Sequence, residues 1–331
     1  MIARQLLEAR EHEYLAPFAT FADASAGRLR EDRPCELRTV FMRDRDRIIH
    51  CKSFRRLKHK TQVFLSPEGD HYRTRLTHTL EVSQIARTIA RAMGLNEDLT
   101  EAIALGHDLG HTPFGHSGEQ VLDEISSQGF THAQQSLRVV DVLELDRAGL
   151  NLTAEVRDGI ACHSIKDAAA TPEGRLVYWA DHIAYVNHDI DDAIRAGVLR
   201  EEQLPQSMFT VLGDRHSVRI NTMIHGILHG SENGQIAMTP DVLYAYEELH
   251  DFLFEQVYYN KVAKAEEGKA KQAIGTLFEY FMNHPNKLPD AEQCALEQEG
   301  AERVILDYIS GMTDRFCIAT FEELFVPKVW R

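Results

Sequence analysis

The amino-acid sequence predicts an all-α fold, and three observations support this prediction. Apolar residues recur at the three- and four-residue spacings of amphipathic helices through most of the chain. Clean alternation of apolar and polar residues, which would indicate half-buried strands, is not found, nor is a repeat of 20–50 residues. Gly94 and Asn96 stand where one apolar helix would end and the next would begin. Only the segment 230–235 (GSENGQ) leaves room for a short β-hairpin.

The first predicted helices lead into an irregular segment. Residues 72–93 form the first apolar helix, which the spacing of Leu76, Leu80, Ile85, Ile89 and Met93 defines. The second helix starts after Asn96 and runs through Leu99 and Ile103 toward His107. The stretch GHTPFGHSG that follows should be irregular, because Pro113 and the glycines interrupt a helix there.

Further helices are predicted at 132–144, 153–162, 173–196, 241–283 and 294–315, with a loop at 284–293. This order divides the chain into a core of residues 1–200 with an N-terminal extension and a C-terminal helical region, 201–331, packed on it. No Pro/Ser-rich linker marks a boundary near 200–215, so a single domain is the alternative. Aromatic residues within 241–283, such as Phe252, Phe254, Phe278 and Tyr280, are expected in the core.

Composition excludes several classes of protein. The 331 residues are 44% hydrophobic and 26% charged, as in ordinary globular proteins. No apolar run of about 18 residues exists that could span a membrane, and the charged N-terminus does not resemble a signal peptide. The five cysteines are scattered and form no CxxC pair. We therefore expect free thiols and a cytoplasmic protein.

Charge is distributed unevenly along the chain. The net charge is −15, yet residues 43–60 contain eight Lys or Arg against two Asp. One basic segment in an acidic protein indicates a focused anion site, with Arg73 and Arg75 following it. A solvated basic helix is the equally weighted alternative.

Four side chains could hold a metal ion. His78 shares a helix face with apolar residues, and His107 and Asp108 end the next apolar helix. Asp181 stands among apolar residues of a further helix, where a lone carboxylate would be costly to bury. Two imidazoles and two carboxylates suit a divalent ion such as Mn, Fe, Co, Ni, Zn or Mg. Each residue alone has a structural explanation, but all of these explanations would have to hold at once.

The pattern resembles a known family. His78, His107-Asp108 and Asp181 reproduce the H…HD…D order of the HD-domain metal phosphohydrolases, which have a helical core. The longer stretches RDRDRIIHCKSFRRLKHKTQVF, GDHYRTRLTHTLEVSQIARTIAR, AIALGHDLGHTPFGHSGE, FTHAQQSLRVVD, GIACHS and YWADHIAYVNHDIDD are similar to the deoxyguanosinetriphosphate triphosphohydrolase family. The similarity runs from about residue 11 to 200, with LGDRHSVRINTMI extending it, and is loose over 240–331.

This resemblance implies metal-dependent hydrolysis of deoxynucleoside triphosphates to deoxynucleoside and triphosphate, by attack on the α-phosphorus. His116 matches the family's proton-shuttle position, and Glu119, three residues on, can orient its ring in the first turn of a helix. His111 and His132 match positions beside the α-phosphate. Some relatives differ at the position of His111.

The resemblance also implies substrate contacts. Arg75, three residues before His78 on one helix face, would direct its guanidinium at phosphate, and an ion pair with another segment is its alternative. Tyr185 and Asp189 follow Asp181 at steps of four residues and would contact the deoxyribose, with Asp189 accepting from the 3′-hydroxyl. Gln62 is a candidate contact to the base edge.

Two other functions stay open at this point. An HD-type nucleotidase or cyclic-nucleotide phosphodiesterase shares the metal ligands, although GHTPFGHSGE and FTHAQQS speak against it. The other alternative is a nucleotide-sensing or single-stranded nucleic-acid-binding protein without turnover. The complete metal set, His116 and Glu119 argue against it. The resemblance further implies a homo-oligomer, and a second nucleotide acting as activator.

Overall fold

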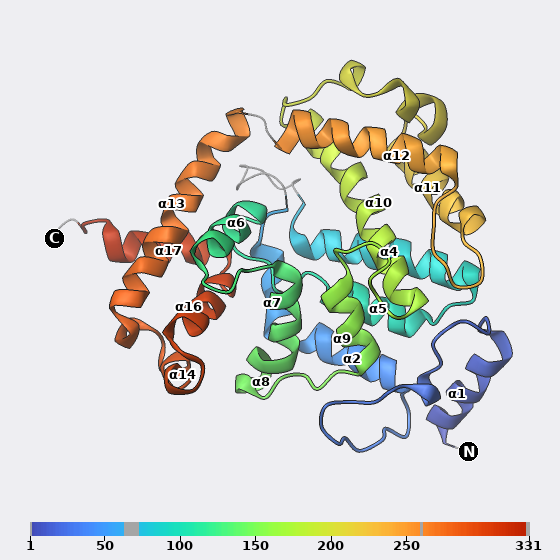
Figure 1. The fold of residues 1–331 in the computed structure, drawn as a ribbon, viewed down its shortest axis with the longest axis horizontal. Helices are drawn as coiled ribbons and strands as arrows, with labels where there is room; N and C mark the ends of the chain where they lie inside the picture. Colours follow the sequence, from blue (N-terminus) through green and yellow to red (C-terminus); the bar gives the residue numbers. More distant parts are fainter. Residues whose placement is uncertain (1, 63–72, 259–260, 329–331) are drawn as a thin grey trace.

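The computed structural model describes residues 2–62, 73–258 and 261–328. It confirms the predicted all-α fold (Figure 1). The α-helices are α1 (Ala3–Tyr14), α2 (Val40–His50), α3 (Lys52–Arg56), α4 (Arg75–Met93), α5 (Glu97–Gly106), α6 (His116–Ile125), α7 (His132–Arg138), α8 (Glu144–Arg147), α9 (Ala154–Cys162), α10 (Pro172–Arg195), α11 (His216–Gly230), α12 (Pro240–Leu253), α13 (Lys261–Asn283), α14 (Asp290–Gln293), α15 (Leu296–Glu299), α16 (Ala301–Ser310) and α17 (Asp314–Phe325).

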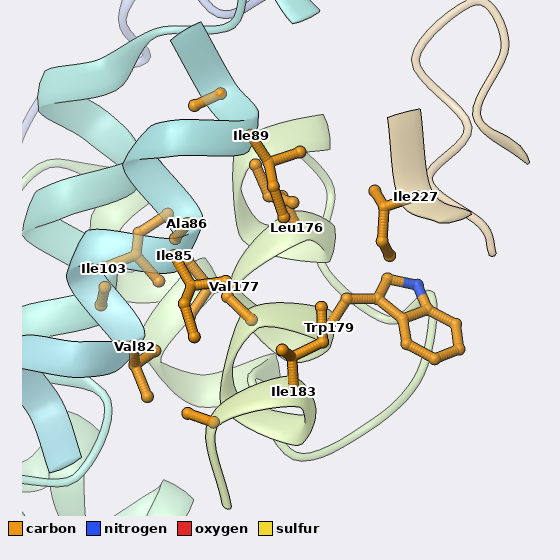
Figure 2. Close-up of a cluster of buried hydrophobic side chains, with 14 of the residues drawn as sticks. Val82, Ile85, Ala86, Ile89, Ile103, Leu176, Val177, Trp179, Ile183 and Ile227 are labelled. Carbon is orange, nitrogen blue, oxygen red and sulfur yellow. The ribbon is translucent and has the colours of Figure 1, made fainter. Parts of the chain in front are cut away.

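Helices α4, α5 and α10 form the centre of the molecule and pack on one another. Their apolar faces meet in a layer of branched side chains around Trp179, which Figure 2 shows with Ile85 and Ile89 of α4 opposite Leu176 and Val177 of α10. These side chains are almost completely buried. Fully burying one of them stabilises the fold by about 1.5–3 kcal/mol, so this layer fixes how α4, α5 and α10 lie against one another.

A second apolar cluster joins the C-terminal helices to the segment between α5 and α7. Phe114, Leu122 and Phe130 pack there with residues of α13 and α16, such as Ile274 and Ile305. Figure 1 shows α13, α16 and α17 on the same side of the molecule as α6. Residues 270–317 therefore cover one side of the segment that carries the dense histidines.

The capping predictions around α4 and α5 agree with the structure. Gly94 ends α4 with φ = +68°, a conformation that glycine adopts without strain. The Asn96 side chain accepts a hydrogen bond from the Leu99 N–H and so begins α5. Residue 72, where the sequence placed the start of the first helix, lies outside the described residues, and α4 itself begins at Arg75.

Several predicted elements were wrong in extent. The helix expected at 294–315 is three helices, because Gly300 has φ = +81° and Thr313 caps a new helix at Asp314. Residues 284–293, expected as a loop, contain a 3₁₀ turn and α14. The helix at 132–144 changes to a π-helical turn after Arg138, and the one at 241–283 is divided into α12, a π turn and α13.

The segment 230–235 forms no hairpin. Glu232 and Gln235 make one isolated bridge, and the described residues contain no strand longer than such bridges. No described helix combines the length and apolar character needed to cross a bilayer.

The arginines at the start of the basic segment 43–60 form ion pairs within the fold. Arg45 pairs with Asp98 of α5 at 2.7 Å, and Arg43 and Arg47 pair with Asp32. Ion pairs between segments therefore account for its three α2 arginines, which the sequence could not assign to partners.

Candidate active site

Two histidines and two aspartates from α4, α10 and the end of α5 converge in the interior. The Nε2 atom of His78 lies 2.9 Å from Oδ1 of Asp181. The Nε2 atom of His107 lies 3.8 Å from the same oxygen and 3.5 Å from Oδ1 of Asp108. Donor atoms about 2.0–2.2 Å from one ion lie about 3–4 Å apart. The ligand atoms of His78, His107 and Asp108 are thus close enough together to surround a single cation, and Asp181 contacts both histidines.

The hydrogen bond of His107 leaves its Nε2 atom available to a metal ion. Its Nδ1–H donates to the carbonyl of Ala104 at 2.7 Å, so Nε2 carries the lone pair. That Nε2 atom is buried and has no hydrogen-bond partner among the described residues. A backbone acceptor behind the ring is the usual support of a metal-bound imidazole. The ligand atoms of His78, His107 and Asp108 all lie within 4.8 Å of one another, and the cluster is consistent with a divalent cation.

Both carboxylates of this cluster are held in the charged form. Burial alone would raise their pKa values, but electrostatic interactions with His107, His111 and Arg75 hold the pKa of Asp108 well below its usual range. For Asp181, burial is likewise outweighed by the hydrogen bond with His78 and the electrostatic interaction with His107, which lower its pKa. Two anions in one site, Asp108 buried and Asp181 partly buried, require compensating positive charge, which fits a divalent ion.

Arg75 lies beside the cluster as its spacing from His78 predicted. Its Nη1 donates to Oδ2 of Asp108 at 2.9 Å, the oxygen turned away from His107. The guanidinium is buried, and its Nε and Nη2 atoms have no partner among the described residues. The ion pair named as the alternative therefore exists, yet it uses only part of the guanidinium. The remaining N–H groups are available to an anion.

The segment after Asp108 presents a second set of groups. His116 begins α6, and Glu119 lies in its first turn, as expected. One Glu119 oxygen lies 3.4 Å from Nδ1 of His116, and the other lies 2.8 Å from Nδ1 of His132. The His116 side chain is 77% exposed, unlike the buried histidines around it. Glu119 thus orients two imidazoles, of which His116 is the one open to solvent.

His132 is held as an imidazolium by its two neighbours. His163 donates from Nδ1 to the carbonyl of Ile160 at 2.7 Å, and burial lowers the pKa of His163 to about 3. Its Nε2 is therefore an acceptor, and it lies 3.1 Å from Nε2 of His132. The other nitrogen of His132 faces Glu119. Despite burial, hydrogen bonds with His116 and His132 lower the pKa of the Glu119 carboxyl. Both nitrogens of His132 must donate, in agreement with its raised pKa.

His111 stacks on this imidazolium, with ring centroids 4.1 Å apart. Its Nε2 lies 3.4 Å from Oδ1 of Asp108. Burial, followed by the charge of Arg75, lowers the pKa of His111 well below its usual value. His111 is therefore a neutral ring between the metal cluster and His132.

A cavity of about 500 Å³ connects these groups. Every residue assigned from the sequence lines it except His107 and Glu119, which lie behind its wall: Gln62, Arg75, His78, Asp108, His111, His116, His132, Asp181, Tyr185 and Asp189. Asp189 is buried, and burial together with Asp192 and Asp181 raises its pKa well above the usual value. Burial also raises the pKa of Tyr185. Beyond Asp181, the α10 side of the cavity therefore carries two polar side chains, Tyr185 and Asp189, whose charged forms burial disfavours.

Some lining residues were not expected from the sequence. His182, His250, Phe254 and Lys271 border the same cavity. Phe254, expected in the core, is 46% exposed and is the first residue of the π turn that follows α12. Lys271 donates to Gln120 of α6 at 2.6 Å. No spacing in the sequence connects α12 and α13 to site residues that lie so much earlier in the chain.

His163 was also missed as a site residue, although GIACHS contributes to the family resemblance. Its effect depends on a contact with His132, 31 residues away. A histidine at the end of a predicted helix gave no sign of it.

Comparison with known families agrees with this geometry. Residues 75–186 match the HD domain, and residues 236–323 match the phosphohydrolase-associated domain. The first match contains His78, His107, Asp108 and Asp181. The second contains the helices that border the cavity from the C-terminal side.

Two solved structures share the fold at low sequence identity. A phosphohydrolase from Bacteroides thetaiotaomicron superposes with a TM-score of 0.53 at 18% identity, covering 85% of this chain and 69% of that one. A hypothetical protein from Aquifex aeolicus gives 0.50 at 19% identity, covering 86% and 68%.

Whole-chain relatives are much more similar. A deoxyguanosinetriphosphate triphosphohydrolase-like protein of Caldanaerobacter subterraneus subsp. tengcongensis is 54% identical over 331 residues, covering 100% of this chain and 98% of that protein. Proteins of the same description from Desulfatibacillum aliphaticivorans and Clostridium tetani are 51% and 47% identical, covering 99% of this chain and 99% and 98% of theirs. The chain belongs to the deoxyguanosinetriphosphate triphosphohydrolase-like family of HD-domain phosphohydrolases.

Proposed function

We propose that this protein hydrolyses deoxynucleoside triphosphates to the deoxynucleoside and intact triphosphate, with a divalent metal ion held by His78, His107, Asp108 and Asp181. One observation carries the proposal. Three of the metal-donor residues, His78, Asp108 and Asp181, border the same cavity as the exposed His116, whose ring Glu119 contacts from behind the cavity wall. Hydrolysis at the α-phosphorus needs both, one for the phosphate and water and one for the leaving 5′-oxygen.

When bound, the divalent ion would polarise phosphate oxygens and lower the pKa of a water molecule. Arg75 adds a fixed guanidinium beside it, with buried N–H groups that the protein leaves unpartnered. His132, protonated between Glu119 and His163, adds positive charge without offering a free N–H. Together they stabilise the negative charge that develops on the α-phosphate during attack.

His116 supplies the proton that the leaving oxygen needs. The deoxynucleoside 5′-alkoxide is a poor leaving group, so protonation by a positioned acid lowers the barrier. His116 is exposed to the cavity, and Glu119 orients its ring through Nδ1, which leaves Nε2 for the substrate.

The sugar and base contacts follow from the cavity floor. Tyr185 and Asp189 stand one and two helical turns beyond Asp181 on α10 and line the cavity. We assign them to the deoxyribose, with Asp189 accepting from the 3′-hydroxyl. Gln62 is assigned to the base edge.

Product analysis tests the proposal. Protein loaded with Mn²⁺, Mg²⁺, Co²⁺ or Zn²⁺ is incubated with each deoxynucleoside triphosphate, alone and in mixtures, and the products are separated by anion exchange. The expected products are deoxynucleoside and triphosphate in equal amounts. Orthophosphate or pyrophosphate would indicate a nucleotidase instead, opening of a cyclic nucleotide would indicate a phosphodiesterase, and binding without turnover would indicate a nucleotide-sensing protein. The mixtures also test the predicted activating nucleotide.

A further inference from the structure

The turn that carries His116 is strained. Phe114 has φ = +61°, a conformation that bulky residues rarely adopt and that costs of the order of 1–3 kcal/mol. Gly115 follows with φ = +57°, and α6 starts at the next residue. The direction of the His116 side chain therefore depends on whatever keeps this turn in place.

The C-terminal region supplies the group that holds the turn. Asp314, at the start of α17, is buried and lies 200 residues after Phe114 in sequence. Its Oδ1 accepts the Phe114 N–H at 3.0 Å. Its Oδ2 accepts the N–H of Thr61 at 2.9 Å and the hydroxyl of Thr61 at 2.7 Å. One carboxylate thus joins the strained turn to the segment that precedes α4.

Lys60 makes a parallel connection. This buried ammonium donates to the carbonyl of His111 and to the carbonyl of Ser310 at 2.8 Å. Its backbone carbonyl accepts the N–H of Arg75 at 3.1 Å. The loop 111–115 is therefore fixed at both of its ends from the same side, by α16, by α17 and by residues 60–61.

We propose that Asp314 is a positioning residue for catalysis: its carboxylate, with Lys60 beside it, holds the Phe114–Gly115 turn so that His116 faces the cavity. The inference rests on the proposed function of His116. It gives the C-terminal region a part in the chemical step even though Asp314 does not line the cavity. A displacement of about 1 Å in a catalytic group can cost about a hundredfold in rate.

Asp314→Asn tests this with little change in volume. The N–H groups of Phe114 and Thr61 contact different oxygens of Asp314, and asparagine would present an NH₂ donor to one of them. We expect kcat for triphosphate release to fall about 10–100-fold, with KM within about threefold and metal content unchanged, because the substituted residue touches neither substrate nor metal ligands. Hydrogen–deuterium exchange at the amides of residues 112–116 should become faster.

The chain offers a matched control in Asp44. Its Oδ2 also accepts the N–H and hydroxyl of one threonine, Thr153, at 2.8 and 2.7 Å, but its other oxygen pairs with Arg28 rather than with the catalytic turn. Asp44→Asn should therefore lower the melting temperature without slowing the chemical step or changing exchange at 112–116.

Two outcomes overturn the inference: a kcat for Asp314→Asn within twofold of the Asp44→Asn control, or unchanged exchange at 112–116. If Asp314→Asn does not fold, Asp314→Glu keeps the charge but moves the oxygens, and the same two criteria apply. Wild-type protein that releases no triphosphate would refute the proposed function separately. The exchange measurement, and the kcat ratio for whichever phosphoester is then hydrolysed, would still decide the role of Asp314.

Discussion

Replacing His163 by phenylalanine should shift the alkaline limb of the pH–rate profile to lower pH. His163 accepts the Nε2–H of His132 at 3.1 Å and so stabilises the imidazolium form of His132. Phenylalanine keeps the ring that packs on His107, whose centroid lies 5.0 Å away, but it accepts no hydrogen bond. The Glu119 contact at the other nitrogen remains.

The size of the shift follows from the lost hydrogen bond. A hydrogen bond from a charged group contributes about 1.5–3 kcal/mol, and one pKa unit corresponds to about 1.4 kcal/mol. The pKa of His132, which Glu119 and Asp108 raise above its usual value despite burial, should fall by about 1–2 units when the acceptor at Nε2 is lost. If protonated His132 stabilises the transition state, activity on the alkaline limb should drop about 10–100-fold, while activity at acidic pH changes little.

Two measurements check this prediction. The pH dependence of triphosphate release is compared for wild type, His163→Phe and His163→Gln, whose amide oxygen can restore the acceptor. NMR of histidine labelled with ¹³C at Cε1 follows the titration of His132 directly. An alkaline limb at the same pH in all three proteins would refute the reasoning, as would an unchanged His132 titration in His163→Phe.

Three further predictions concern the metal site, the proton shuttle and stability. Asp108→Ala and Asp181→Ala should each lose metal and activity together, measured by elemental analysis and product release; full turnover by either would remove that residue from the site. His116→Ala should retain metal and substrate binding but lose about 10²–10⁴ in kcat, and an unchanged kcat would exclude His116 from the chemistry. Burial raises the pKa of Glu11 from 4.5 to about 7, so the folded state binds this proton more tightly and the unfolding free energy decreases as pH rises through that interval. Glu11→Gln, which mimics the neutral form, should therefore melt higher than wild type at pH 8 and equally at pH 4.5, and a lower melting temperature at pH 8 would contradict this.

The fold was predictable where local chemistry decided it. Gly94 and Asn96 end one helix and begin the next by conformational preferences that need no distant partner. The missed break at Gly300 shows the limit, because a glycine within an apolar pattern does not reveal that its φ is +81°. The helix periods around His78 and Asp181 indicated buried polar groups, and the structure brings those groups together.

The supporting contacts of the site were not predictable in the same way. Asp314 reaches Phe114 across 200 residues, and His163 reaches His132 across 31. Neither pair has a spacing that a helix or turn would connect. Such contacts depend on how α16, α17 and α9 pack, and that packing is decided by the whole apolar core.

Isotope labelling tests the central claim most directly. Metal-loaded protein hydrolyses a deoxynucleoside triphosphate in ¹⁸O-labelled water, and both products are analysed by mass spectrometry. Attack on the α-phosphorus with departure of the 5′-oxygen predicts one ¹⁸O atom in each triphosphate and none in the deoxynucleoside. Label in the deoxynucleoside, or its appearance in orthophosphate or pyrophosphate, would contradict the account.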